Sequence, residues 1–261
     1  MVSPTRPLRG ILYSGGKLVR PKGRGPLELR AVEIVPNFIS SAEGSALIKL
    51  GETQVICTAS LEETVPPFLK GQGRGWISSE YSMIPRSTET RTPREAVKGK
   101  QSGRTMEIQR LIGRSLRAIT DPEALGERTI LIDCDVIRAD GGTRTASITG
   151  SMVALGIALQ KLVRMHVLEK QPLRDYVAAV SVGLFGGEVL LDLDYAEDSN
   201  ADVDMNVIMT GAGQLVEVQA TAETTPFSKD FLADLISAAE PAIAYLVSLQ
   251  KATLKLALSS A

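Results

Sequence analysis

A strand, a glycine-rich turn and a helix follow one another in the middle of this chain, and this order constrains its fold most. Residues 130–137 form an apolar run typical of a buried strand, and residues 148–155 favour a helix. The turn between them reads Asp140-Gly141-Gly142-Thr143-Arg144-Thr145-Ala146-Ser147. Its two glycines let the backbone approach a ligand closely, and its hydroxyl side chains can cap a helix.

This turn has the composition of a phosphate site. The first backbone amides of a helix point at an anion, and the guanidinium group of Arg144 adds a planar set of donors. A plain tight turn from strand to helix explains the same residues about equally well, because glycine turns before helices are common. The rest of the chain has to decide between the two interpretations.

The charges are balanced overall and separated locally. The formal net charge is −1, which argues against nucleic-acid binding if the charges are evenly spread. Residues 86–117 are strongly basic, however, and residues 188–204 hold seven acidic residues without a lysine or arginine. We therefore expect a polarised molecule that can bind a polyanion on one part of its surface.

The few histidines and cysteines exclude several mechanisms. His166 is the single histidine, so a two-histidine zinc site is excluded, and we expect this residue to be structural or exposed. Cys57 and Cys134 each lie in an apolar run, where buried free thiols are more common than a disulfide. No apolar run approaches the roughly 20 residues of a membrane span, and the first residues lack a secretory signal. We expect a cytoplasmic protein that does not interact with a membrane.

The chain reads as alternating groups of strands and helices after a basic start. Residues 1–30 are rich in proline and glycine, and we expect a mobile arm or loop there, with ordered structure from about Ala31. Residues 86–100 are predicted to form a polar loop. We expect strands at 31–35, 45–50, 54–60, 76–83, 129–137, 177–184, 188–194, 205–209 and 215–219, and helices at 102–119, from the glycine turn to about 167, and at 228–256.

Two aspartates near the end of the acidic stretch form a candidate metal site. Asp198 and Asp204 stand six positions apart, where we expect a loop that runs into a strand. Carboxylates brought together in this way can hold Mg²⁺, which accepts a few protein oxygens together with water and phosphate oxygens. A solvated acidic loop is the better explanation for such a cluster alone. The neighbouring phosphate and polyanion signals favour the metal.

The polar loop is a candidate for contact with nucleic acid. Arg86, Arg91 and Arg94 alternate there with threonines whose hydroxyls suit phosphate groups, although a solvated charged surface is the better explanation for an isolated loop. Arg104, at the start of the next helix, can join Arg144 at a single anion. Residues 71–76 fail the dinucleotide-binding pattern because Trp76 replaces its last glycine, and the sequence has no Walker lysine motif.

Several long strings in the same order resemble the RNase PH family. The resemblance extends from about Arg20 to near the C-terminus. The matching strings are Ala42-Glu43-Gly44-Ser45, Val65-Pro66-Pro67-Phe68-Leu69-Lys70-Gly71, the segment Ser102 to Arg114, Asp133-Cys134-Asp135-Val136, the segment Ala139 to Ser147, Glu197-Asp198-Ser199 and Asp204-Met205-Asn206.

The resemblance implies a phosphate-dependent 3′→5′ exoribonuclease that trims the 3′ ends of tRNA precursors and other RNAs and releases nucleoside diphosphates. It implies an α+β fold: a duplicated βαβα-type unit, similar to ribosomal protein S5 domain 2, with mixed sheets packed against helices. Inorganic phosphate is the implied co-substrate and Mg²⁺ the implied metal, and the implied assembly is a homohexameric ring built as a trimer of dimers. The implied roles are phosphate binding by Arg104, Gly142, Thr143 and Arg144, catalysis and metal binding by Asp198 and Asp204, and RNA binding by Arg86, Arg91 and Arg94.

The chain departs from the family pattern near its start. Lys22 stands where the family commonly has an aspartate, which puts the local salt bridges in doubt. We expect residues 1–19 to form an N-terminal extension, residues 20–168 a first subdomain and residues 169–261 a second. Two other functions remain open: a catalytically silent RNA-binding ring subunit, which predicts loss of the arginines or aspartates above, and a hydrolytic metal nuclease, which has no need of a phosphate pocket.

Overall fold

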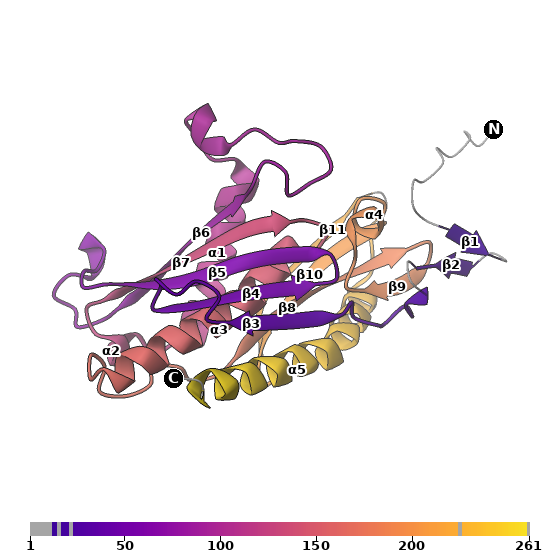
Figure 1. The fold of residues 1–261 in the computed structure, drawn as a ribbon. Helices are drawn as coiled ribbons and strands as arrows, with labels where there is room; N and C mark the ends of the chain where they lie inside the picture. The colour runs from indigo at the N-terminus through magenta and orange to yellow at the C-terminus, as the bar shows by residue number, and fades with distance from the viewer. Residues whose placement is uncertain (1–11, 15–16, 21–22, 224–225, 260–261) are drawn as a thin grey trace.

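The computed structural model describes residues 12–14, 17–20, 23–223 and 226–259, which form two sheets packed with helices (Figure 1). The first sheet has the order β3-β4-β5-β7-β6. All its neighbouring strands are antiparallel except β6 and β7, which run parallel, so the sheet is mixed. The strands are β3 (Val32–Pro36), β4 (Gly44–Leu50), β5 (Thr53–Glu62), β6 (Trp76–Met83) and β7 (Thr129–Arg138).

The second sheet is antiparallel and has the order β11-β10-β8-β9. Alternating side chains of its central strands point to opposite faces, as the pleat requires. Val177 and Ala179 belong to the core shared with the first sheet, whereas Ala178 and Val180 pack with the C-terminal helix. Its strands are β8 (Val177–Phe185), β9 (Glu188–Leu191), β10 (Val203–Thr210) and β11 (Leu215–Ala222).

Each sheet is followed along the chain by a long helix that packs against it, in agreement with the expected duplicated α+β fold. Helix α3 (Thr143–Arg164) is almost wholly buried and contacts β4 and β5 of the first sheet as well as β8 of the second. Helix α5 (Lys229–Ser259) lies along the other face of the second sheet (Figure 1). Because α3 is buried between both sheets, its N-terminus is held firmly by the core.

Helix α1 (Gly103–Ala118) packs on β6, and the single-turn helix α2 (Pro122–Leu125) precedes β7. Ser102 caps α1 by accepting a hydrogen bond from the Thr105 amide at 3.2 Å. A short helix, η2 (Pro67–Leu69), precedes β6. The connection from β6 to α1 contains a second short helix, η3 (Glu95–Lys98), and projects from the body of the protein in Figure 1. The expected polar loop is therefore a protruding segment.

One expectation, about the start of the chain, is wrong. Ordered structure begins before Ala31: β1 (Leu12–Ser14) pairs with β2 (Lys17–Val19), and Arg20, Arg24 and Arg30 make buried or partly buried hydrogen bonds. The other residues of the expected N-terminal extension lie outside the described residues. By length and composition alone, α3 and α5 are apolar enough to cross a membrane; the apolar window of α3 is 83% buried inside the protein and that of α5 is 33% buried.

The expectations for cysteine and histidine are confirmed. Cys57 and Cys134 are buried free thiols that face each other on β5 and β7, with 4.0 Å between their sulfur atoms. The hydrogen bond to Cys134, which is the larger cause, and burial raise the pKa of the Cys57 thiol well above its usual value. His166 is exposed just beyond the end of α3.

Candidate active site

The glycine turn ends at the N-terminus of α3. Gly142 is the N-cap residue, and Gly141 and Gly142 have φ angles of 72° and 66°, a left-handed conformation that strains other residues. The first backbone amides of the helix have no acceptor within it, and Arg144 lies in its first turn. The helix dipole and these amides favour an anion at this end.

Side chains from three other elements surround this helix start. The Tyr81 hydroxyl of β6 donates to Thr143 Oγ1 at 2.9 Å, and burial raises the pKa of Tyr81. Arg144 donates to Gln219 Oε1 of β11 at 3.0 Å and lies 3.7 Å from the Glu107 carboxylate of α1. The first turn of α3 therefore holds Arg144 beside α1 and the second sheet.

Asp198 and Asp204 approach each other beside Arg144 and Arg104. Asp198 ends the single-turn helix α4 (Tyr195–Asp198), and Asp204 is the second residue of β10. Burial, together with the charge of Asp198 and a hydrogen bond to it, raises the pKa of Asp204 to about 6, although Arg144 and Arg104 oppose this shift. The four side chains that the sequence assigned to phosphate and metal are therefore close enough to interact.

The acidic pair fits a metal that is also bound by substrate. Asp204 Oδ1 is buried without a hydrogen-bond partner, a costly arrangement that a cation would relieve. No group of three or more histidine, cysteine or carboxylate side chains with metal-binding geometry occurs in the described part of the chain. Two carboxylates suit Mg²⁺, because this ion usually keeps water and phosphate oxygens among its ligands.

The segment before Asp198 is not the expected strand and loop. The strand expected at 188–194 ends at Leu191, because Asp192 adopts a left-handed φ of 56° and Asp194 caps α4. Asp194 accepts from the Glu197 amide at 2.9 Å, and Glu197 accepts from the Asp194 amide at 3.0 Å. This reciprocal capping box fixes the turn of helix that ends at Asp198.

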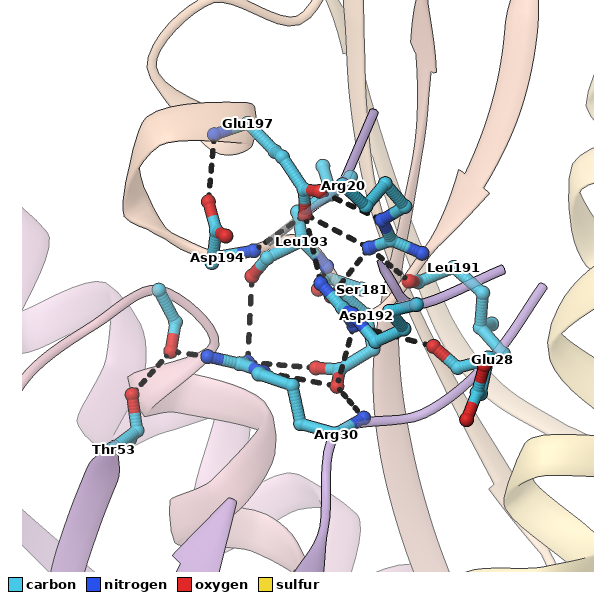
Figure 2. Close-up of polar contacts among 12 residues, drawn as sticks. Arg20, Glu28, Arg30, Thr53, Ser181, Leu191, Asp192, Leu193, Asp194 and Glu197 are labelled. Atoms are coloured by element: carbon cyan, nitrogen blue, oxygen red, sulfur yellow. Dashed lines mark hydrogen bonds and ion pairs between the residues drawn. The ribbon is translucent and has the colours of Figure 1, made fainter. Parts of the chain in front are cut away.

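Three N-terminal arginines bind this segment, and Figure 2 labels two of them, Arg20 and Arg30. Arg20 donates to both carboxylate oxygens of Glu197 at 2.7 and 2.8 Å. Arg24 donates to Glu197 at 3.0 Å, and Arg30 donates to both oxygens of Asp192 at 2.9 and 2.7 Å. Lys22, the residue that departs from the family pattern, lies outside the described residues.

The candidate RNA-binding arginines form a separate, exposed region. Arg86, Arg91 and Arg94 are all exposed on the connection between β6 and α1. Arg86 donates to the Glu89 carbonyl at 2.8 Å, and Arg94 is the N-cap residue of η3. The structure thus separates a partly buried site at α3 from a cationic protrusion that follows β6.

Sequence reasoning missed the residues that support the site. Tyr81, Gln219, Arg30 and Asp192 come from segments far from the glycine turn, and none belongs to a local motif. The apolar alternation of 76–83 places Tyr81 on the buried face, which is a usable signal. Asp192 follows the apolar end of a strand, and an acidic residue at such a position was the signal that could have indicated a buried ion pair.

The comparisons with known proteins identify the family of the chain. The model of the 3′ exoribonuclease family, domain 1, matches residues 28–159, and that of domain 2 matches residues 175–241. Ribonuclease PH of Bacillus mycoides is 60% identical over 237 residues, which cover 90% of this chain and 97% of the relative. Ribonuclease PH of Bacillus cereus (strain B4264) is 59% identical over the same shares.

Solved structures share the fold at lower identity. The exosome of Archaeoglobus fulgidus with RNA bound to its active site matches with a TM-score of 0.74 and 25% identity, over 87% of this chain and 91% of that one. Rice (Oryza sativa) Rrp46 matches with a TM-score of 0.73 and 19% identity, over 90% of this chain and all of that one. The latter similarity supports the fold alone.

Proposed function

We infer that this chain, which belongs to the RNase PH family of 3′ exoribonucleases, shortens RNA from its 3′ end with inorganic phosphate as co-substrate. The observation that carries the chemical assignment is the meeting of two arginines and two aspartates at the start of α3. An anion-binding helix end beside a carboxylate pair suits a reaction in which two phosphate groups must approach each other.

The reaction transfers a nucleotidyl group to phosphate. An oxygen of inorganic phosphate attacks the phosphorus of the last phosphodiester, and the bond from that phosphorus to the 3′ oxygen of the preceding nucleotide breaks. The proton of the attacking hydrogen phosphate balances the one that the leaving 3′ oxygen takes up. The products are a nucleoside 5′-diphosphate and an RNA that is one nucleotide shorter with a free 3′ hydroxyl. Phosphate is a sufficient nucleophile at neutral pH, so the mechanism needs no histidine base.

We assign phosphate binding to Arg104, Gly142, Thr143 and Arg144. Gly142 and Thr143 present backbone amides at the start of α3, where the helix dipole favours the anion. Arg144 is only 16% exposed, so its charge acts where water screens it weakly. Arg104 is exposed on α1, and its positive charge acts on Asp204 of the same site. These cations orient the attacking phosphate and reduce its repulsion from the RNA.

We assign Asp198 and Asp204 as the catalytic carboxylates that would hold Mg²⁺. The buried, unpartnered Oδ1 of Asp204 supports this assignment. When bound, Mg²⁺ supplies positive charge that stabilises the phosphoryl oxygens during transfer. The carboxylates themselves fix where that charge sits, because Asp198 is held by the capping box of α4 and Asp204 by its place within β10.

We assign RNA binding to Arg86, Arg91 and Arg94, whose exposed cationic side chains suit a phosphate backbone. The proposed physiological substrates are tRNA precursors, and the proposed assembly is a homohexameric ring made as a trimer of dimers. We place the enzyme in the cytoplasm and divide the chain at about residue 168 into two subdomains. A ring would bring several copies of the cationic protrusion together around the RNA.

Two other functions make different predictions. A catalytically silent RNA-binding subunit should lack the phosphate arginines or the acidic pair, but this chain has Arg104, Arg144, Asp198 and Asp204. A hydrolytic metal nuclease would not need an anion site formed by a helix end and two arginines. The phosphorolytic assignment is the one that uses every part of the site.

A product analysis tests the function. The purified protein is incubated with Mg²⁺ and a 3′-extended tRNA, with and without phosphate. We expect nucleoside diphosphates only when phosphate is present. Nucleoside monophosphates would identify hydrolysis instead, and intact but bound RNA would identify the silent subunit.

The variant Arg144→Ala tests the phosphate site. Loss of one preorganised donor to the reacting anion should lower the rate by about 10²- to 10³-fold and raise the KM for phosphate. Arg174→Ala is the matched control, because Arg174 makes an exposed ion pair with Asp121 at 3.2 Å. Unchanged turnover and phosphate KM in Arg144→Ala would contradict the assignment.

A further inference from the structure

Two loops meet beside the proposed phosphate and metal sites. The phosphate loop is residues 140–142, and the acid loop is residues 192–198. A Cβ atom placed on Gly141 would lie 2.6 Å from both the Asp194 carbonyl carbon and the Leu193 oxygen. The Tyr195 amide also donates to Asp140 Oδ1 at 3.4 Å. The backbones of the two loops are therefore in direct contact.

Arg30 joins these loops with a single side chain (Figure 2). Its Nε and one terminal nitrogen donate to the two carboxylate oxygens of Asp192, and that terminal nitrogen also lies 3.4 Å from the Leu193 oxygen. Its other terminal nitrogen donates to the Asp140 carbonyl of the phosphate loop. One planar guanidinium group thus binds the acid loop on one edge and the phosphate loop on the other.

The pair formed by Arg30 and Asp192 is buried. The two side chains are only 8% and 1% exposed. Burial lowers the pKa of Arg30, but the hydrogen bond and charge of Asp192 more than offset this, so the pKa is raised overall. Lysine can carry the same charge but cannot reproduce this planar set of donors. The arrangement therefore depends on the geometry of arginine as well as on its charge.

Asp192 is itself fixed on several sides. Its carboxylate accepts from the Arg30 amide at 2.8 Å, and its own amide donates to the Ser181 carbonyl of β8 at 2.7 Å. The next amide, that of Leu193, donates to Ser181 Oγ at 3.0 Å. The acid loop is thereby tied to the second sheet, and Arg30 extends this attachment to the phosphate loop.

We propose that Arg30 and Asp192 are positioning residues that set the separation between the bound phosphate and the acidic pair. The proposal rests on the proposed function, because it takes the phosphate loop and Asp198 as parts of one reaction site. Both side chains bind other groups of the protein. They act through Asp140 to Gly142 on one side and through the chain leading to Asp198 on the other. A displacement of about 1 Å between reacting groups lowers a rate by about 100-fold.

Thr53 provides a matched comparison, because it holds the phosphate loop alone. Its hydroxyl donates to the Gly141 carbonyl at 2.7 Å and accepts from the Asp140 amide at 2.9 Å. Thr53→Val keeps the shape of the side chain and removes both hydrogen bonds. This variant should weaken phosphate binding without a change in Mg²⁺ binding, whereas Arg30→Lys should weaken both.

The experiment compares wild type, Arg30→Lys, Thr53→Val and the control Arg128→Lys, whose arginine makes an exposed ion pair with Glu63. Calorimetry measures binding of inorganic phosphate and of Mg²⁺, and kinetics give kcat and the KM for phosphate and RNA. We expect Arg30→Lys to lower kcat about 10- to 100-fold, to weaken phosphate and Mg²⁺ binding at least about threefold, and to leave the KM for RNA within about twofold. The control should match wild type in every quantity.

Other outcomes overturn the proposal. If Arg30→Lys lowers only the melting temperature or the active fraction, with both binding constants unchanged, then Arg30 is merely structural. Should that variant not fold, Asp192→Asn is measured in the same way, because it removes the carboxylate charge at almost constant size. Because Arg30 and Asp192 contact each other directly, the losses of the two single variants should not add in the double variant. Wild-type protein without phosphate-dependent activity would instead refute the proposed function and leave the loop contacts unexplained.

Discussion

The site at the start of α3 and the cationic protrusion between β6 and α1 are built in opposite ways. At the site, Arg144 and Asp204 are half-buried, and the buried pair of Arg30 and Asp192 joins the loop that precedes α3 to the loop that contains Asp198. On the protrusion, Arg86, Arg91 and Arg94 are exposed to solvent. Phosphoryl transfer requires fixed distances, whereas guidance of a flexible RNA requires only positive charge in the right region.

This contrast teaches where substitutions should act on chemistry and where they should act on affinity. A charge held by buried partners cannot be moved without a change in the reaction geometry. An exposed arginine can be replaced at the cost of one phosphate contact. Substitutions in the two regions should therefore have separate effects in kinetic measurements.

Asp204→Asn should have the largest effect. It removes the buried carboxylate proposed to hold the metal, so kcat should fall by about 10²- to 10³-fold while RNA affinity stays within about twofold. Asp202→Asn is the control, because Asp202 lies in the same segment but accepts a hydrogen bond from the Gly186 amide at 3.1 Å. A large loss of RNA affinity in Asp204→Asn would break the separation of the two regions.

Gly141→Ala should strongly destabilise the site. The new methyl group would collide with backbone atoms of the acid loop at 2.6 Å, and the left-handed φ of 72° adds strain. Gly213→Ala isolates the second effect, since Gly213 has a φ of 79° and no atom lies within 4 Å of the position that its Cβ would take. Denaturant unfolding should show a loss of about 1 kcal/mol for Gly213→Ala and a larger loss for Gly141→Ala. Equal losses would mean that the loops are not in contact.

The double variant Arg91→Ala, Arg94→Ala should affect RNA affinity alone. We expect the affinity for single-stranded RNA to fall by about tenfold, with the salt dependence reduced by about 1.4 in slope for two lost phosphate contacts. The KM for phosphate should not change. Lys170→Ala, Arg174→Ala serves as the control, because it removes two charges ahead of β8, away from the protrusion. A raised KM for phosphate in the Arg91 and Arg94 variant would contradict the assignment.

The smallest expected effect concerns the protonation of Asp204 in metal-free protein. Its pKa of about 6 is raised by burial and by Asp198, and it is lowered by Arg144 and Arg104. Asp198→Asn should therefore lower this pKa, and Arg144→Ala should raise it. An NMR titration that observes the side-chain carboxyl carbon of Asp204, in the presence of a chelator, measures its pKa in both variants. A change of this pKa in the opposite direction in either variant would show that the substituted side chain does not face Asp204.

The fold was largely predictable because its strands and helices carry strong local patterns. The strand predicted at 76–83 is found at Trp76–Met83, and the helix predicted at 102–119 is found at Gly103–Ala118. Helix α4 was missed because its single turn depends on the capping box of Asp194 and Glu197 rather than on apolar periodicity. The predicted start of the ordered chain was also wrong. The proline and glycine content of residues 1–30 indicated a loop, but arginines in this segment are held by carboxylates that lie far away in the sequence.

The candidate site was predictable only where its residues belong to local motifs. The glycine turn with Arg144, and the pair Asp198 and Asp204, were recognisable from the sequence, and the structure brings them together. Arg30 and Asp192 were not recognisable, because their contact joins residues separated by 162 positions. Sequence patterns record local backbone preferences, whereas the side chains that hold a site in place are brought together by the tertiary fold.

A crystal structure of the protein soaked in phosphate tests whether the start of α3 binds the attacking phosphate. We expect an anion within about 3 Å of the guanidinium groups of Arg104 and Arg144 and of the first amides of α3. At saturating phosphate, an anion that binds only at a distance from both arginines and from the start of α3 would be the contrary result. It would contradict the claim that this helix end binds the phosphate that cleaves the RNA chain.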